Sequence, residues 1–381
     1  MISRPGLNIS SEEIERRKEM VRALWRYEPV DHIPINMRIM PNPSGYSLTE
    51  QLTNSRKQLE LNWLCVKESL RVMPDDYIPI LRPDMGCMMV ATMFGAEVVY
   101  SDHPEGMPWR KEPLIFEADQ IYELEVPDPY EDGLMPKALE RIELFMKETD
   151  YQIPTCLMDM GGPMNAAKDL LDTNLLYLLF HDDPKAMKHL LDLLAETYLR
   201  ADEAMVEAAG GIENVVTTDW DPTWCPEGHQ GYVSDDVCAT FSPQVFREFS
   251  KPANNKLLRR FGGGLIHNCG PHPCVEEYLS HDPPLHGCNM AYDYSVADLP
   301  RIREAFAGKG LVYMGLSGMS PSSEGSVSIE QYRRCMDELA PEVACVPQSL
   351  VDPATLDISP GELYQGLRKV SEEYARRMEW R

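Results

Sequence analysis

The stretch Gly264-Leu265-Ile266-His267-Asn268-Cys269-Gly270 decides both the fold and the site that we predict. Its apolar beginning predicts a short buried strand that ends at two residues able to bind a soft metal. Because side chains at positions i and i+2 of a strand project to the same face, we expect His267 and Cys269 to reach one zinc ion. Cys345, at the end of the apolar run 342–345, is our candidate for a third ligand. Two thiolates and one imidazole leave the fourth position open, as in catalytic zinc sites.

Eight segments with the pattern of short buried strands alternate with helical patterns along the chain. Strands that alternate with helices pair in parallel through right-handed crossovers. We therefore predict a single (β/α)8 TIM barrel over residues 1–381, with an N-terminal helical extension opened by the capping box Ser10-x-x-Glu13. A doubly wound open sheet is the alternative, but no GxGxxG motif follows an early strand. The predicted strands are residues 33–37, 77–81, 152–157, 214–217, 264–267, 285–289, 311–314 and 342–345, and the helices include 48–70, 136–148, 184–209, 243–261, 299–306, 329–339 and 361–378.

Polar residues fall at the carboxyl ends of these strands, where a TIM barrel forms its active site. We expect catalytic roles for Asp84, Asp219 and Asp221, and substrate contacts from Arg38, Asp159 and Asn289. Turn formation is the alternative for each single residue, since Asp and Asn are common in turns. The full set also contains Ser317 after the seventh strand, together with His267, Cys269 and Cys345.

A second pair of possible ligands follows the fifth strand closely. His272 and Cys274 compete with His267 and Cys269, but we predict that they begin a helix over residues 274–279. We therefore rank them below the first pair.

Composition limits the classes of function. The net charge of −25 argues against nucleic acid as a partner, because phosphates attract patches of Lys and Arg. No run approaches the roughly 18 apolar residues of a membrane helix, so we expect no membrane partner. The first residues contain no apolar signal segment, so we expect a cytoplasmic protein with reduced thiols. The ten cysteines include no CxxC pair, which argues against a disulfide framework.

Several motifs resemble those of the uroporphyrinogen decarboxylase superfamily over nearly the whole chain. They are Glu28-Pro29-Val30-Asp31-His32-Ile33-Pro34, Gly161-Gly162-Pro163 with Asp182-Asp183-Pro184, and Phe241-Ser242-Pro243 followed by His267-Asn268-Cys269-Gly270. The resemblance implies a single TIM barrel, in agreement with the count of strands.

Two branches of that superfamily are relevant. Arg38 and Asp84 match an arginine and an aspartate with which the true decarboxylases bind their acidic tetrapyrrole. The position of their second arginine falls near Pro41 in this chain, and that of their tyrosine falls near Lys168. Their late Gly-His pair is absent as well, so the chain keeps only part of the decarboxylase pattern. Unpaired substrate carboxylates bind poorly, and we expect no uroporphyrinogen decarboxylation.

The cobamide-dependent methyltransferases resemble this chain at the metal positions. They carry His-x-Cys after strand five and a cysteine after strand eight, which His267, Cys269 and Cys345 match, although Val346-Pro347-Gln348 replaces the usual glycine after the last cysteine. The resemblance implies Zn²⁺, a corrinoid carried by a separate corrinoid-binding protein, and a small methyl acceptor or donor such as a thiol or tetrahydrofolate. A metal-independent lyase acting on a carboxylated substrate, or a non-catalytic corrinoid-binding barrel, are the alternatives.

Overall fold

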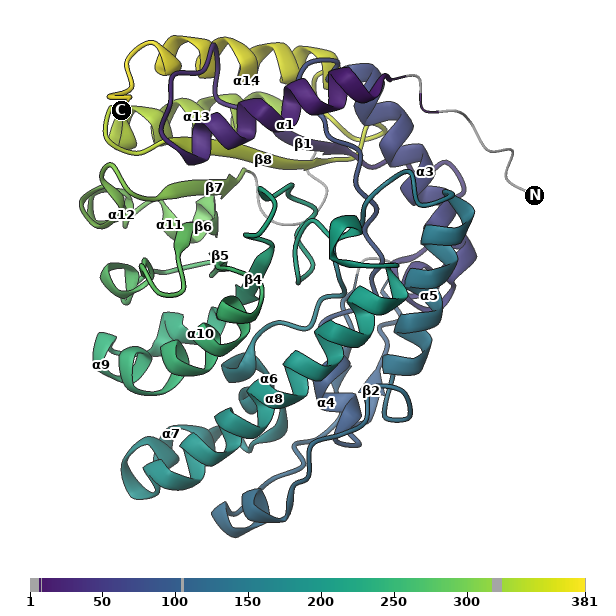
Figure 1. Ribbon diagram of the computed structural model, residues 1–381, viewed down its shortest axis with the longest axis vertical. Coiled ribbons are helices and arrows are strands. Elements are labelled where there is room, and N and C mark those ends of the chain that lie inside the picture. The colour runs from purple at the N-terminus through teal and green to yellow at the C-terminus, as the bar shows by residue number, and fades with distance from the viewer. Residues whose placement is uncertain (1–6, 8, 104–105, 317–323, 381) are drawn as a thin grey trace.

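The computed structural model describes residues 7, 9–103, 106–316 and 324–380. Its centre is a curved sheet of six parallel strands in the order β1-β8-β7-β6-β5-β4, with helices on the outer face (Figure 1). The strands are β1 (Asn36–Ile39), β4 (Gly231–Ser234), β5 (Gly264–His267), β6 (Leu285–Ala291), β7 (Leu311–Gly315) and β8 (Cys345–Val351). The sheet and its helices form an α/β fold of the TIM-like type that the alternation of strands and helices predicts.

The remaining predicted strands pair over only a few residues and do not join the six-stranded sheet as regular strands. Segments 77–81, 152–157 and 214–217 meet at parallel bridges, Leu81 with Thr155 and Thr155 with Val215, flanked by backbone hydrogen bonds such as that from Leu157 N to Thr217 O (3.1 Å). Their parallel sense continues the curve of the sheet, and the amide of Thr218 donates to the carbonyl of Gln230 (2.9 Å), just before β4. The structure thus shows a six-stranded curled sheet, whereas we predicted eight strands in a closed barrel.

Strand boundaries differ most at the two ends of the predicted set. β5 has the predicted bounds, whereas β1 and β8 each begin three residues later than predicted, and β8 ends six residues later. β4 was not predicted at all. Ser317, predicted to follow the seventh strand, lies outside the described residues.

The helices follow the predicted pattern closely, and α12 has the predicted bounds. The predicted helix 48–70 is divided at Asn54, whose side chain accepts hydrogen bonds from the first amides of α3. The Ser10 capping box opens α1 as predicted. The helices of six or more residues are α1 (Ser11–Trp25), α2 (Leu48–Thr53), α3 (Ser55–Val72), α5 (Met135–Glu148), α6 (Pro163–Leu170), α7 (Thr173–Asp182), α8 (Pro184–Ala208), α10 (Lys251–Arg260), α12 (Leu299–Phe306), α13 (Gly325–Leu339) and α14 (Pro360–Ala375).

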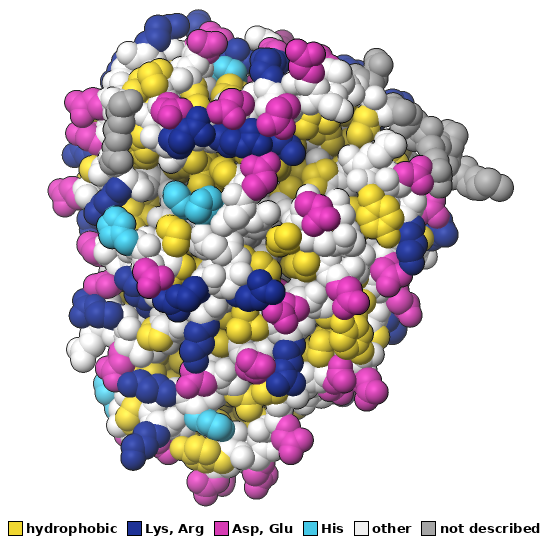
Figure 2. All heavy atoms as spheres, in the orientation of Figure 1, with side chains coloured by type: hydrophobic (Ala, Val, Ile, Leu, Met, Phe, Trp, Pro, Cys, Tyr) yellow, Lys and Arg dark blue, Asp and Glu magenta, His cyan; other side chains and the backbone are white. Residues whose placement is uncertain are grey.

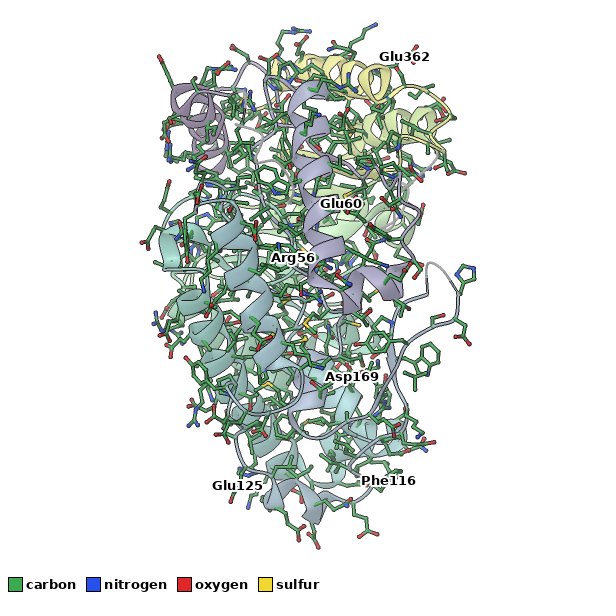
Figure 3. All side chains as sticks on the ribbon, turned by 90° about the vertical axis from the view of Figure 1, so that its right-hand side faces the viewer. Arg56, Glu60, Phe116, Glu125, Asp169 and Glu362 are labelled. Atoms are coloured by element: carbon green, nitrogen blue, oxygen red, sulfur yellow. The ribbon has the colours of Figure 1, made fainter. Side chains whose placement is uncertain are left out.

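Short elements and surface charges complete the fold. The β2–β3 hairpin (Val98–Val99, Trp109–Arg110) and the turn η1 (Ala118–Glu123) belong to a segment that reaches the end of the molecule opposite α14, where Phe116 is labelled (Figure 3). Acidic and basic side chains are interspersed over the face that carries α1 (Figure 2), as in the ion pair of Arg22 with Glu227 (2.8 Å). Within the described ranges, no helix combines the length and apolar character needed to cross a membrane.

Candidate metal centre

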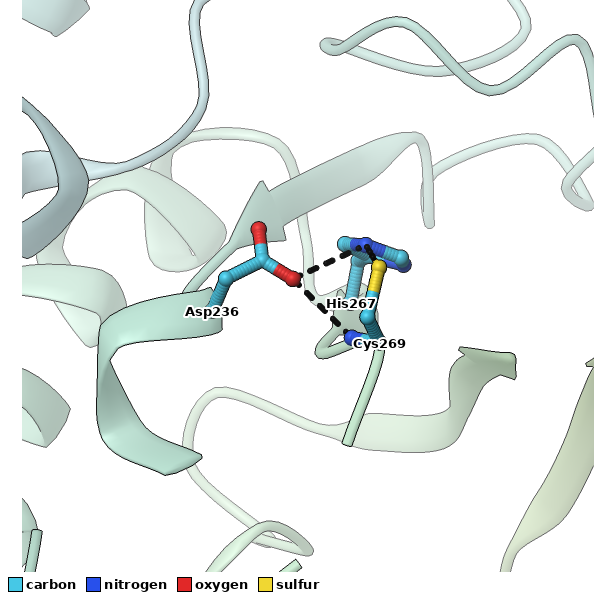
Figure 4. Close-up of side chains that lie close together, drawn as sticks. All are labelled: Asp236, His267 and Cys269. Atoms are coloured by element: carbon cyan, nitrogen blue, oxygen red, sulfur yellow. Dashed lines mark hydrogen bonds and ion pairs between the residues drawn. The ribbon is translucent and has the colours of Figure 1, made fainter. Parts of the chain in front are cut away.

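Three residues able to bind a metal meet where β4 and β5 end. His267 is the last residue of β5, Cys269 follows it by two, and Asp236 opens the short turn η3 (Asp236–Thr240) after β4. His267 Nε2 lies 3.3 Å from Asp236 Oδ1 and 3.4 Å from Cys269 Sγ (Figure 4). The three potential ligand atoms lie within 4.8 Å of one another. Because β4 and β5 are parallel neighbours, their carboxyl ends bring these side chains together.

The charges of Asp236 and His267 depend on each other. Burial disfavours the charged form of Asp236, but the positive charge of His267 and hydrogen bonds from His267 and Cys269 outweigh it and lower the pKa of Asp236. Burial also opposes protonation of His267, but the negative charge of Asp236 outweighs it and raises the pKa of His267 well above its usual value. The side chain of His267 is buried, while that of Asp236 is 44% exposed. The group therefore has one buried wall and one side open to solvent.

The other ring nitrogen of His267 begins a chain of hydrogen bonds through the interior. His267 Nδ1 bonds to Asn289 Oδ1, and Asn289 Nδ2 donates to Gln348 Oε1. Gln348 Nε2 donates in turn to Thr223 Oγ1 (2.7 Å) and to Asp221 Oδ2 (3.2 Å). One hydrogen-bonded network thus joins His267, Asn289 and Asp221, which we predicted as site residues at the ends of three different strands.

A cavity lies beside this network. It holds about 450 Å³ of empty space, part of which is open to solvent. Trp220 lines it and also presents its ring edge-to-face to His267, with 5.2 Å between the ring centroids. The other side chains at its wall include Asn36, Arg38, Arg82, Asp221, Gln348 and Leu350.

The predicted substrate and catalytic residues lie around this cavity in different states. Arg38 is buried and donates to the carbonyl of Ile80 (3.2 Å), while its Nε has no partner among the described residues. Asp84 forms an ion pair with Arg82 (2.7 Å). Their roles as substrate-binding and catalytic groups remain predictions.

Two further predicted carboxylates sit next to the metal centre. Asp219 accepts hydrogen bonds from Ser234 Oγ (2.7 Å) and from the amide of Trp220 (2.9 Å), and burial raises its pKa to about 7. Burial, together with the negative charges of Asp219 and Asp84, raises the pKa of Asp159 well above its usual value. A carboxylic acid that keeps its proton near neutral pH can serve as a proton donor.

The predicted third ligand, Cys345, requires a correction. Cys345 begins β8 instead of ending it, so it lies one strand length away from the carboxyl edge where His267 sits. The carbonyl of Cys345 accepts a hydrogen bond from Tyr332 of α13 (3.1 Å), and its thiol interacts with Cys335 of the same helix. Burial raises the pKa of the Cys345 thiol well above its usual value. The structure therefore does not bring Cys345 to the group, in which Asp236 is the third residue beside His267 and Cys269.

The competing ligands His272 and Cys274 also lie away from the group. His272 bonds to Ser295 Oγ (2.8 Å), and burial lowers its pKa to about 4. The thiol of Cys274 is buried and points to the carbonyls of Cys238 and Phe241. Ranking them below His267 and Cys269 agrees with this geometry, although the predicted helix 274–279 is only the turn Val275–Glu277.

Sequence reasoning missed Asp236, Arg82, Trp220 and Gln348. A signal for Asp236 was present, because Ser234-Asp235-Asp236 places two acids directly after the apolar pair Tyr232-Val233, as expected at a strand end. Gln348 gave no such signal, because Pro347-Gln348-Ser349 does not have the composition of a buried strand.

The protein is thus an α/β protein with a curled parallel sheet, and a carboxylate, an imidazole and a thiol meet at the carboxyl edge of that sheet. The family model for uroporphyrinogen decarboxylase (URO-D) matches residues 15–306, so the chain belongs to this family. Among solved structures, a methyltransferase from Methanosarcina mazei has the same fold, with a TM-score of 0.68 and 17% identity over 94% of this chain and 99% of that one. A B12-independent methionine synthase from Shewanella sp. W3-18-1 gives a TM-score of 0.43 and 11% identity over 91% and 97% of the two chains. No curated protein matches this sequence.

Proposed function

We propose that this protein is a zinc-dependent methyltransferase that moves a methyl group between a corrinoid-binding protein and a small acceptor or donor such as a thiol or tetrahydrofolate. The observation that carries the proposal is the convergence of Asp236, His267 and Cys269 at the carboxyl edge of the sheet. The URO-D family and the fold shared with a methyltransferase support methyl transfer over other reactions.

The donor set fits a divalent zinc ion. Zinc binds thiolate, imidazole and carboxylate ligands, and catalytic sites keep a fourth position for water or substrate. The carboxylate of Asp236 and the thiolate of Cys269 together neutralise a 2+ charge. His267 turns Nε2 toward both of them while Nδ1 bonds to Asn289, an arrangement that orients a ligand histidine.

The chemistry requires a deprotonated acceptor. When bound, zinc lowers the pKa of a coordinated thiol and so supplies a thiolate at neutral pH. In such a transfer the acceptor thiolate would form the sulfur–carbon bond, and the electron pair of the broken cobalt–carbon bond would remain on the corrinoid of the partner. The cavity beside Trp220 lies next to the metal centre and is the place where we put the small acceptor, and the exposed side of Asp236 leaves an approach for the partner protein.

The test measures metal and transfer together. The protein, purified under reducing conditions, should contain about one zinc ion per chain by mass spectrometry. It should transfer methyl from free methylcobalamin to a thiol, which is followed as a change in the cobalamin spectrum. A chain that holds no zinc contradicts the proposal, and a chain that holds zinc and corrinoid without transfer supports the non-catalytic alternative.

A second assay addresses the decarboxylase branch. We expect no coproporphyrinogen from uroporphyrinogen, because the second arginine, the tyrosine and the late histidine that the resemblance assigns to tetrapyrrole binding are missing. Product detected by fluorescence after oxidation, at ordinary enzymatic rates, would return the chain to that branch.

A further inference from the structure

Building on the proposed metal site, we infer that Gln348 is a positioning residue: through Asn289 it keeps a proton on His267 Nδ1 and leaves Nε2 directed at the metal. Gln348 is separated from His267 by one intervening side chain, that of Asn289, and belongs to β8, three strands away in the sheet. Its effect on His267 therefore passes through hydrogen bonds.

The direction of the network is set at its far end. Asp221 is a hydrogen-bond acceptor there, because Thr223 Oγ1 donates to its Oδ1 (2.9 Å) and Tyr232 OH donates to its Oδ2 (3.3 Å). Because both carboxylate oxygens of Asp221 accept hydrogen bonds, the group of Gln348 that faces Asp221 must be a hydrogen-bond donor. Gln348 must therefore present its Nε2 to Asp221 and its Oε1 to the other side.

Thr223 gives the same orientation, because its single hydroxyl proton also goes to Asp221. Its oxygen therefore only accepts from its other neighbours. Those neighbours are Asn36 Nδ2 (2.8 Å) and Gln348 Nε2 (2.7 Å). Exchanging the two ends of the Gln348 amide would bring oxygen against oxygen at both Thr223 and Asp221.

The orientation then passes along the network to the metal ligand. Gln348 Oε1 faces Asn289 and can only accept, so Asn289 must turn its donor, Nδ2, toward Gln348. The other end of the Asn289 amide, Oδ1, accordingly faces His267 and requires a proton on Nδ1. Nε2, the nitrogen next to Asp236 and Cys269, is left to bind the ion.

The first experiment measures zinc affinity of the full chain by competition with a chromophoric chelator. Asn289→Leu should weaken zinc binding about 10- to 100-fold, as loss of outer partners of ligand histidines does, and Gln348→Leu about tenfold. Ser349→Ala is the matched control, because Ser349 is the next residue of β8 and its hydroxyl has no partner among the described residues. It should bind zinc as the wild type does. Urea midpoints establish that each variant is folded.

The second experiment needs no metal. In metal-free protein labelled with ¹⁵N-histidine, the proton on Nδ1 of His267 should give a downfield signal protected from solvent exchange, assigned by its loss in His267→Gln. The signal should persist in Ser349→Ala, disappear in Asn289→Leu, and exchange at least tenfold faster in Gln348→Leu.

The outcomes separate the two proposals. If Gln348→Leu keeps both the wild-type zinc affinity and the protected proton, the positioning role is overturned. If the wild type binds no zinc while the pattern of protected protons holds, the proposed metal site fails and the control of the His267 proton by Gln348 stands.

Discussion

Two cysteines that we predicted to bind one ion lie at opposite ends of the parallel strands. Cys269, at the carboxyl edge, is partly exposed beside His267 and Asp236, whereas Cys345 is buried against α13. Carboxylates differ with their neighbours as well: the pKa of Asp236 is lowered beside His267, while burial raises the pKa of Asp202 in α8 well above its usual value. A residue type able to bind metal is thus informative only together with the face on which its element presents it.

The largest expected effect tests the carboxyl edge. Cys269→Ser should remove most of the bound zinc and nearly all methyl transfer, because it replaces a thiolate that the ion requires. The fold should persist, since the buried core does not depend on the metal. Metal analysis and the cobalamin assay measure both. Cys274→Ser is the control, since its thiol points to backbone carbonyls, and a loss of zinc there would place the site in the 267–274 loop.

Asp236→Ala tests the ligand that the sequence did not suggest. Zinc affinity should fall by more than about 100-fold, because the loss of an outer partner alone costs 10- to 100-fold. The matched control is Asp202→Asn, a carboxylate change in the helix layer, and chelator competition measures both variants. Equal zinc affinity in Asp236→Ala and the wild type would remove Asp236 from the site.

The same comparison shows what the sequence predicts well. His267 and Cys269 were found because β5 is an uninterrupted apolar run whose end is obvious and whose alternation fixes the shared face. Cys345 was misplaced because β8 continues for six residues through Pro347-Gln348-Ser349, whose composition is typical of a loop. Burial between two layers lets such residues form a strand, a tertiary effect that local composition does not reveal.

The irregular side of the sheet shows the same limit. Segments 77–81, 152–157 and 214–217 were predicted as strands from their apolar residues, and they do run in parallel. Their backbone hydrogen bonds are few, as when Leu81 N donates to Pro154 O (2.8 Å) and Thr155 N to Asn214 O (2.8 Å). The apolar pattern thus predicted their place in the core and their parallel pairing, but not how short that pairing is.

Cys345→Ala gives a smaller effect of a different kind. We expect zinc affinity and methyl transfer to stay at wild-type values, while the free energy of unfolding falls by about 1–2 kcal/mol through loss of buried packing against α13. Urea unfolding and chelator competition separate the two. A loss of zinc in this variant would restore the ligand set first predicted and contradict the position of β8.

The smallest effect is the pH dependence contributed by Asp202. Its carboxyl group is buried, and Oδ1 has no partner among the described residues, so burial raises its pKa in the folded state above the unfolded value. The folded state then binds this proton more tightly, and the contribution of Asp202 to stability falls as pH rises above about 4.

The Asp202→Asn variant has no such proton to lose. The difference in unfolding free energy between the variant and the wild type should therefore shift in favour of the variant between pH 4.5 and pH 8. Because the new amide must also find partners, the measured quantity is that shift, from urea unfolding at both pH values. Asp192→Asn, an exposed change on the same helix, should show a smaller shift. Equal shifts in the two variants would mean that the folded protein holds Asp202 ionised, and the contrast between Asp236 and Asp202 would then not hold.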